Sequence, residues 1–219
     1  MIQRTLDPRL AFSAVRSRCF RAFAVAASLF VLASTLNAQD VVVNFDAATT
    51  QVEFTLGATL HTVHGVFKLK SGQIHFDRAT GKAGGVVILD ATSGNTGNSS
   101  RDKKMHAEIL ESAKFPEIAF SPTQVTGPVV EMLAGKPVQL RVAGVFRLHG
   151  QDHAMTIPVT VAPASGSGRS GLLEASTTFD VPYVKWGLKN PSTFVLHVSD
   201  TVNLAIHSAA QIARPGASR

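Results

Sequence analysis

The sequence predicts one all-β domain, either a sandwich or an antiparallel barrel, with one inserted α-helix. Three observations predict this fold. Several segments alternate apolar and polar residues with a period of two, as half-buried strands do. Turn signals such as Ser71-Gly72, Thr80-Gly81 and Gly150 separate these segments. One segment, 101–112, replaces the alternation with helical spacing.

A targeting segment precedes this domain. Residues 1–21 contain five arginines and one acid, and the uncharged apolar run 22–33 follows. A basic start, a short apolar run and a small residue at Ala38 are typical of a secretory signal peptide. The run is too short for a membrane span, which needs about 20 residues. The alternative is a buried core helix. We expect a cleaved signal peptide at 1–38, a mature chain that begins at Gln39, and a periplasmic location.

The charge of the chain lies largely in that leader. The whole chain has 21 basic and 15 acidic residues, a formal net charge of +6. Without residues 1–38, 16 basic and 14 acidic residues remain, a net charge of about +2. This small excess does not indicate a nucleic-acid partner. The single cysteine, Cys19, is also in the leader, so the mature domain contains neither a disulfide nor a cysteine-based metal cluster.

The alternating segments assign an inward face to each expected strand. The opposite faces carry Lys68, Lys70, Arg141 and Arg147, so the apolar faces should point inward. The segment Gly84–Ala91 is continuously apolar, so alternation does not show which of its residues face inward. The expected inward positions are Val52, Phe54, Leu56, Phe67, Leu69, Ile74, Phe76, Leu140, Val142, Phe146, Leu148, Met155, Ile157, Val159, Val161, Phe194, Leu196, Val198, Val202, Leu204 and Ile206.

The helix should run from Arg101 to Ser112, with Met105, Ile109 and Leu110 on its apolar side. Ser99 and Asp102 resemble a capping box at its start, and Phe115-Pro116 ends it. A lone helix between barrel strands commonly covers one end. A second helical turn is expected at 182–187, a hairpin loop at Ser165–Ser170, and a flexible tail at 209–219.

Several strings, in their shared order, resemble the YceI-like family. The strings are Thr50–Phe54 with Leu60–Phe67, Gly72–Asp77, Asp90–Asn98 with Arg101-Asp102, Lys114–Phe120, Val142–Gly150 and Ile157–Val159. The resemblance covers roughly Thr50 to Ile206; the segment Val181–Gly187 and the eight histidines depart from it. It implies that residues 39–208 form a single lipocalin-like antiparallel β-barrel. It also implies that this barrel binds a polyisoprenoid or another long-chain lipid inside its lumen.

The apolar lumen is the leading candidate site. Parity alone does not distinguish a filled core from an open pocket, since both need apolar inward rows. The resemblance favours a pocket, and hence a non-catalytic periplasmic carrier of an isoprenoid or acyl lipid. Transient membrane contact and a homodimer are further partner hypotheses. The expected lining residues are Phe54, Phe67, Leu69, Phe76, Met105, Ile109, Phe120, Phe146, Met155 and Trp186.

The histidines and one charged pair suggest alternatives. With a three-residue loop at Gly150–Asp152, His149 and His153 would be cross-strand neighbours within about 5 Å. Together with His61 and His106 they could form a metal-linked enzyme site, although hydrogen-bonded histidines fit the spacing better. Arg101-Asp102 is interpreted as a structural pair at the loop–helix junction. No nucleophile, phosphate-loop or cofactor motif is present, so no catalytic residue, metal site or cofactor is predicted. A third hypothesis is a ligand-free structural or stress-protective barrel.

Overall fold

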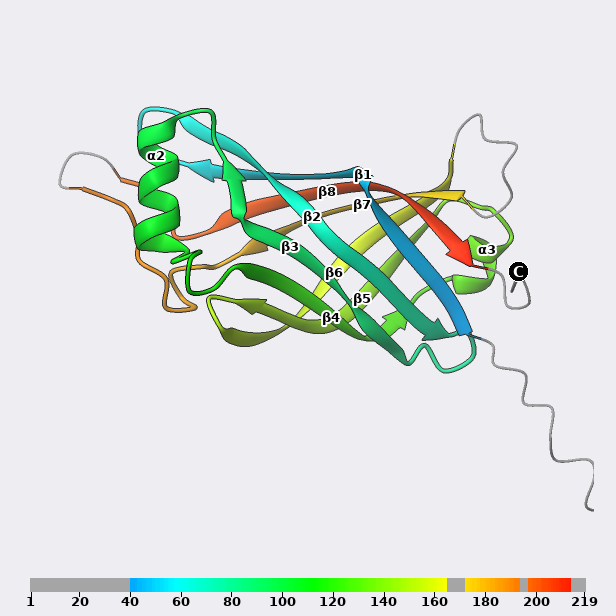
Figure 1. Ribbon diagram of the computed structural model, residues 1–219. Helices are drawn as coiled ribbons and strands as arrows, with labels where there is room; N and C mark the ends of the chain where they lie inside the picture. The colour runs from blue at the N-terminus through cyan, green and yellow to red at the C-terminus, as the bar shows by residue number, and fades with distance from the viewer. Residues whose placement is uncertain (1–39, 165–171, 194–196, 214–219) are drawn as a thin grey trace, which may run out of the picture. The chain divides into compact units, whose positions relative to one another are not determined.

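The computed structural model describes residues 40–164, 172–193 and 197–213, which form an eight-stranded closed barrel (Figure 1). Each strand pairs antiparallel with its neighbours in sequence, and β1 pairs with β8, so the barrel has no free edge. The expected barrel is therefore confirmed. The expected signal peptide, the loop Ser165–Ser170 and the expected inward positions Phe194 and Leu196 lie outside the described residues. The strands are β1 (Asp40–Gly57), β2 (Thr62–Asp77), β3 (Ala83–Asn95), β4 (Glu117–Thr126), β5 (Val138–Leu148), β6 (Gln151–Pro163), β7 (Leu172–Val181) and β8 (Val202–Ala213).

The inward face follows the predicted parity within each segment, and its phase changes within β1 and within β2. The predicted turn at Ser71-Gly72 is wrong, because these residues lie inside β2, where an irregularity in pairing shifts the inward positions from Phe67 and Leu69 to Ile74 and Phe76. In β1, Val41 and Val43 are buried before the irregularity in pairing, and Val52 and Phe54 are buried after it. The Thr50 hydroxyl donates to the Asp46 carbonyl across this bulge (2.7 Å). A bulge adds a residue to one strand and so switches which positions face inward. In the ambiguous segment of β3, the inward positions are Val87, Leu89 and Ala91.

Two helical segments lie at opposite ends of the barrel (Figure 1). Helix α2 (Ser99–Lys104) continues directly into one π-helical turn, η1 (Met105–Ile109). The sequence predicted a helix from Arg101 to Ser112 with Ser99 as its cap, which begins two residues late and ends three residues late. Glu111 has a positive φ (45°), which an α-helix does not continue through. The cap is instead Asn98, whose side chain accepts a hydrogen bond from the Arg101 amide (3.0 Å). A short helix that was not predicted, α3 (Val129–Leu133), covers the other end and buries Val129 and Met132.

The chain end differs from the sequence prediction, whereas the turn after β7 agrees with it. Residues 209–213 belong to β8, in which 210–213 pair with β1 and Ala209 pairs with β7, and Ala210 is fully buried, so the expected tail from 209 is wrong for these residues. The prediction failed because a strand ladder needs only backbone groups, and small side chains pair as well as large ones. Positions 214–219 lie outside the described residues. The expected turn at 182–187 is confirmed by hydrogen bonds from the Trp186 amide to the Pro182 and Tyr183 carbonyls.

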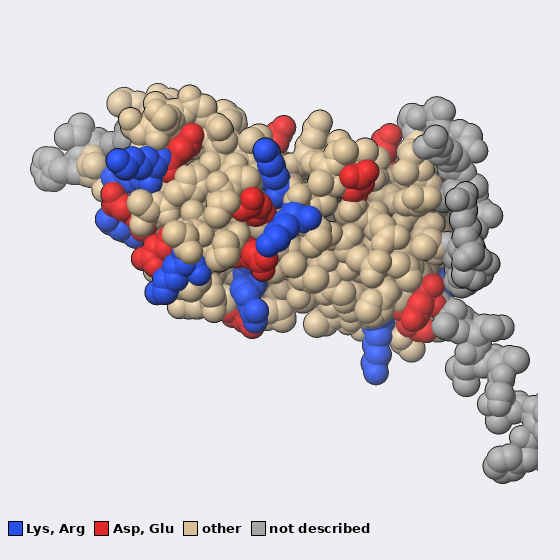
Figure 2. All heavy atoms as spheres, viewed as in Figure 1, with Lys and Arg blue, Asp and Glu red and all other residues tan. Residues whose placement is uncertain are grey.

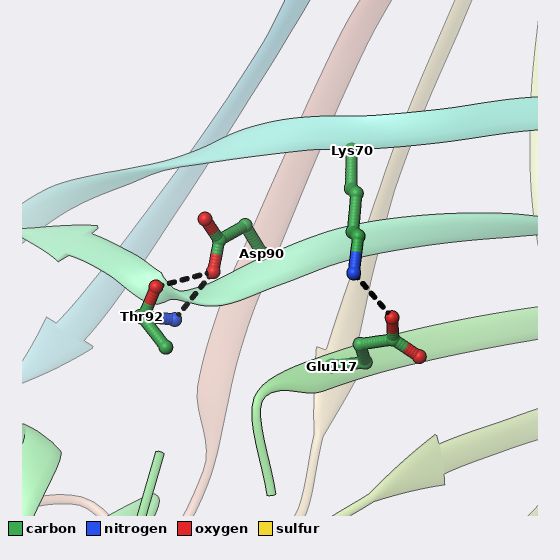
Figure 3. A network of polar contacts seen from close by, with 4 residues as sticks. All are labelled: Lys70, Asp90, Thr92 and Glu117. Atoms are coloured by element: carbon green, nitrogen blue, oxygen red, sulfur yellow. Dashed lines mark hydrogen bonds and ion pairs between the residues drawn. The ribbon is translucent and has the colours of Figure 1, made fainter. Parts of the chain in front are cut away.

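The outer wall carries the polar face. Figure 2 shows cationic and anionic side chains interspersed on the face of the barrel that is in view. On this wall Lys70 of β2 reaches across β3 to Glu117 of β4 (2.6 Å), while Asp90 of β3 accepts hydrogen bonds from the amide and hydroxyl of Thr92 (Figure 3). The Glu117 carboxylate raises the pKa of Lys70 above its usual value. This arrangement confirms that the apolar faces point inward.

The interior contains two apolar clusters. One lies toward α2 and contains Phe54, Phe67 and Phe146; the other lies toward α3 and contains Phe76, Met132 and Leu140. Among the described residues, no helix is long and apolar enough to cross a membrane. The two clusters frame the cavities described next.

Candidate functional site

The larger cavity opens at the end of the barrel that carries α2. Its volume is about 460 Å³. Its apolar walls come from seven strands, all except β6, from α2–η1 and from the segment that follows β7. The wall residues include Phe54, Leu56, Val63, Phe67, Leu89, Met105, Ile109, Leu110, Ile118, Phe146, Leu148, Val181, Leu188, Val198, Val202 and Leu204. We call this space the outer chamber.

The mouth of the outer chamber is polar on one side. Of the described residues that line the chamber, Arg101 and Lys104 are cationic and none is acidic. Thr96 and Ser100 stand beside them, and His61 comes from the β1–β2 connection. Since Ser100, Lys104 and His61 are exposed, this polar side faces solvent. The chamber is therefore amphipathic, with an apolar interior and a cationic rim.

Arg101 and Asp102 hold the start of α2 through Thr96. The Thr96 amide and hydroxyl both donate to Asp102 Oδ1 (2.9 and 2.5 Å). Arg101 Nε donates to the Thr96 hydroxyl (2.8 Å), and one terminal nitrogen of Arg101 donates to the Thr96 carbonyl (3.0 Å). These bonds give the guanidinium a fixed place at the rim. The expected structural role of the pair at the loop–helix junction agrees with this geometry.

A smaller cavity, of about 150 Å³, lies deeper in the barrel toward α3. We call it the inner chamber. Val43, Phe45, Phe76, Val142 and Met132 are among its lining residues. Four buried residues line both chambers and therefore form the boundary between them: Leu89, Ile118, Phe146 and Leu204.

Eight of the ten expected lining residues line one of the chambers. Phe54, Phe67, Met105 and Ile109 line the outer chamber, Phe146 lines both, and Leu69, Phe76 and Phe120 line the inner chamber. Met155 and Trp186 line neither. Met155 packs against the two clusters, and Trp186 lies in the turn after β7 against Phe146 (ring centroids 5.7 Å apart) and His153. Trp186 lies outside the alternating strand segments, so no strand parity supported its prediction as a lining residue.

Two glycines allow the aromatic walls of the outer chamber to close in. A Cβ at Gly65 would overlap the Phe54 ring. A Cβ at Gly94 would lie 2.7 Å from the Phe67 ring and 2.8 Å from the Met105 methyl carbon. Phe54 and Phe67 themselves pack with ring centroids 5.1 Å apart. The aromatic side chains therefore lean over glycine backbone, which removes some lumen volume but leaves the chamber open.

Comparison with known proteins agrees with this architecture. The YceI-like domain family matches residues 44–210, which is most of the chain. The chain belongs to the YceI-like family. No curated protein sequence matches it significantly. The family match confirms the resemblance drawn from the sequence strings.

Solved structures share the fold of this YceI-like protein at low sequence identity. BcnA of Burkholderia cenocepacia has a TM-score of 0.58 and 16% identity, over 78% of this chain and 99% of that one. A polyisoprenoid binding domain from Saccharophagus degradans, described as implicated in plant cell wall breakdown, has a TM-score of 0.57 and 14% identity, over 78% and 98%. The YceI protein of Campylobacter jejuni has a TM-score of 0.56 and 16% identity, over 71% and 88%.

The histidines of this YceI-like protein do not gather. His149 and Gly150 both have positive φ (52° and 73°) and form a two-residue hairpin turn, so the expected three-residue loop is wrong. His153 consequently pairs with Phe146 across the strands and stacks on Trp186 at 4.0 Å, whereas His149 packs against Phe115 at 4.3 Å. The described residues contain no group of three or more metal-ligating side chains.

Two other histidines have separate local partners. His106 bonds the Ser112 hydroxyl (3.0 Å) and the Gly94 carbonyl (2.8 Å), which ties η1 to β3. His64 lies beside the Thr55 hydroxyl on the outer wall (3.3 Å). His61 is the one histidine that lines a chamber. Its place at the rim, like that of Lys104, was not predicted, because both residues come from segments without strand parity.

Proposed function

We propose that this protein is a periplasmic, non-catalytic carrier that holds a long-chain apolar lipid, such as a polyisoprenoid, in its barrel lumen. The observation that carries the proposal is the outer chamber, an apolar space of about 460 Å³ beneath a polar mouth. Family membership supports a binding role, and one structural neighbour is described as a polyisoprenoid binding domain. A lipid tail fits such a chamber because each methylene removed from water contributes about 0.8 kcal/mol.

The rim suggests how the lipid is oriented. Arg101 and Lys104 line one side of the mouth, and no carboxylate among the described lining residues opposes them. An anionic or strongly polar headgroup placed there would keep its hydration and gain a cationic neighbour, while the tail runs inward. Loading and release would then take place at the α2 end, during transient contact with a membrane.

Export to the periplasm rests on the leader sequence. Five arginines, the apolar run 22–33 and the small residue Ala38 support a cleaved signal peptide. N-terminal sequencing of the protein from the extracytoplasmic fraction should begin at Gln39. An intact Met1 in that fraction would instead indicate an uncleaved anchor.

Native mass spectrometry of protein purified from its own cells without detergent tests the carrier function. The expected result is a mass above that of the mature polypeptide, with an organic-extractable lipid that accounts for the difference. A bare polypeptide mass, together with no uptake of added polyprenol or fatty acid, would overturn the proposal in favour of a ligand-free barrel. A bound metal would point instead to the histidine-based alternative.

A further inference from the structure

The boundary between the two chambers is the feature that the carrier function does not explain. If the lumen were only a lipid pocket, its two spaces could be one continuous tube. Instead the chambers meet at the four buried residues Leu89, Ile118, Phe146 and Leu204, from β3, β4, β5 and β8. The boundary therefore receives a side chain from each of four strands around the barrel, and Phe146 is the largest of the four.

The Phe146 ring is held in place from several sides. It contacts Phe179 edge-on with centroids 6.1 Å apart, and Trp186 at 5.7 Å. Trp186 is in turn fixed by a parallel stack on His153, at 4.0 Å and 5° between planes. Phe146 is only 4% exposed. A ring with this many aromatic neighbours has few alternative rotamers, so a flexible lipid tail does not displace it easily.

A second ring narrows the lumen just beyond Phe146. Phe120 is the cross-strand partner of Phe146, so both side chains point to the same face of the sheet. The space for the Phe120 ring comes from Gly144, where a Cβ would lie 2.7 Å from Phe120 Cζ. Past these rings, Met132 of α3 lines the inner chamber and is 4% exposed, so the far end is closed.

We propose that Phe146, with Leu89, Ile118 and Leu204, is a constriction that confines the ligand tail to the outer chamber and so sets the chain length that the protein selects. This inference rests on the proposed lipid-binding function and adds a specificity-determining residue to it. The chemical class it selects is a lipid with a polar head and an unbranched or isoprenoid tail no longer than the outer chamber. Trp186 acts as a positioning residue, because it contacts the Phe146 ring and lines neither chamber.

The length limit can be measured with straight-chain fatty acids from octanoic to icosanoic acid, by displacement of a fluorescent probe. In the parent protein, affinity should rise about fourfold for each added methylene until the outer chamber is full, and then stay level. In Phe146→Ala the chambers join, so the rise should continue to longer acids, while the shortest acids bind no more tightly than to the parent. Leu204→Ala opens the boundary from the opposite strand and should move the limit in the same direction if Phe146→Ala does not fold.

Val142→Phe is the matched control, because Val142 lines the inner chamber alone. Introduced alone, the Val142→Phe ring should leave unchanged the chain length at which affinity stops rising. Introduced together with Phe146→Ala, it should fill the inner chamber and return that chain length to the value of the unsubstituted protein. The inference is overturned if Val142→Phe alone shortens the limit, since the tail would then already occupy the inner chamber. It is also overturned if the folded Phe146→Ala and Leu204→Ala variants keep the limit of the parent, or if the parent shows no limit in this series. The native mass spectrometry described above tests the carrier function separately, because it asks whether the protein holds a lipid and not how long that lipid is.

Discussion

The two ends of the barrel are built from the same alternating strands, yet one end is filled and the other is hollow. At the α3 end a five-residue helix buries Val129 and Met132, and the cavity there is about 150 Å³. At the α2 end an eleven-residue segment, α2–η1, buries no residue, and the cavity is about 460 Å³. The strand pattern specifies the barrel, and the helical segments determine whether each end is plugged or covered.

The largest expected difference between the ends is in aromatic truncation. Phe76→Ala, at the plugged end, should lower the free energy of unfolding by about 3–5 kcal/mol, since a buried ring is lost and a cavity remains. Phe67→Ala, at the hollow end, should cost less, about 2 kcal/mol, because its ring faces the outer chamber of about 460 Å³, whereas Phe76 faces a cavity of only about 150 Å³. Denaturant unfolding of both variants measures the contrast. Equal losses would mean that the outer chamber is closed in solution.

Lipid titration of the same two variants should rank them in the opposite order, with the larger loss of lipid affinity in Phe67→Ala. Phe67→Ala removes part of the outer wall and should weaken binding of a lipid probe. Phe76→Ala should leave binding unchanged wherever the variant remains folded, because Phe76 lines only the inner chamber. A loss of binding on Phe76→Ala alone would show that the tail reaches the inner chamber.

Much of this contrast follows from sequence patterns, but not all. The inward places of Phe54, Phe67 and Phe146 were predictable, because strict alternation in a strand assigns faces directly. The helix α3 was missed because the six residues between Gly127-Pro128 and Gly135 are too few to show helical periodicity. Without α3, the sequence did not predict that Val129 and Met132 fill one end of the barrel, and so did not predict the difference between the two ends.

The residues of the chamber rim and the hairpin at His149 could not be predicted from the sequence, for a different reason. Lys104 and His61 reach the mouth from a helix and a strand connection, and no local pattern relates those segments to each other. The hairpin at His149 was assigned one residue too late, because a histidine at positive φ is uncommon and Gly150 was the visible turn signal. The positions of these residues depend on how distant segments pack together, and the periodicity of a single segment carries no information about that packing.

A methionine pair compares the two helical segments directly. Met132→Ala in α3 should destabilise the protein by about 2–4 kcal/mol, because Met132 is 4% exposed in a packed cluster. Met105→Ala in η1 should cost about 1 kcal/mol, since Met105 is only half-buried over Gly94 and Phe67. Thermal unfolding measures both. If Met105→Ala proved as costly as Met132→Ala, α2–η1 would be a plug and not a cover.

Tyr183 is a buried side chain with a polar group at the hollow end, and it provides an optical probe. Its phenol donates to the Ser199 carbonyl (2.8 Å), and burial raises its pKa to about 12. The folded state therefore holds this proton more tightly than the unfolded state, whose pKa is about 10, so stability should fall as pH rises from about 10 to 12. Because the chain has one tyrosine, its absorbance titration is unambiguous. Tyr183→Phe should abolish the signal and cost about 1 kcal/mol; a titration near pH 10 in the folded protein would show that the segment after β7 opens.

The smallest effect is expected on the outer wall, where neither end of the lumen is involved. Lys70 bridges β2 to Glu117 of β4, but both side chains are largely exposed (56% and 43%). Exposed ion pairs contribute little, because water and salt screen them. Lys70→Gln should therefore leave the unfolding midpoint and the fatty-acid length limit unchanged at neutral pH. Since the Glu117 carboxylate raises the pKa of Lys70, any contribution of the pair is fully present below the usual lysine pKa and is lost only as pH rises above it. The contrary outcome is a clear shift of the unfolding midpoint at neutral pH that added salt reduces. It would show that the β3–β4 pairing, which has only four residue pairs, depends on this ion pair. The outer wall, as well as the two ends, would then determine the stability of the barrel.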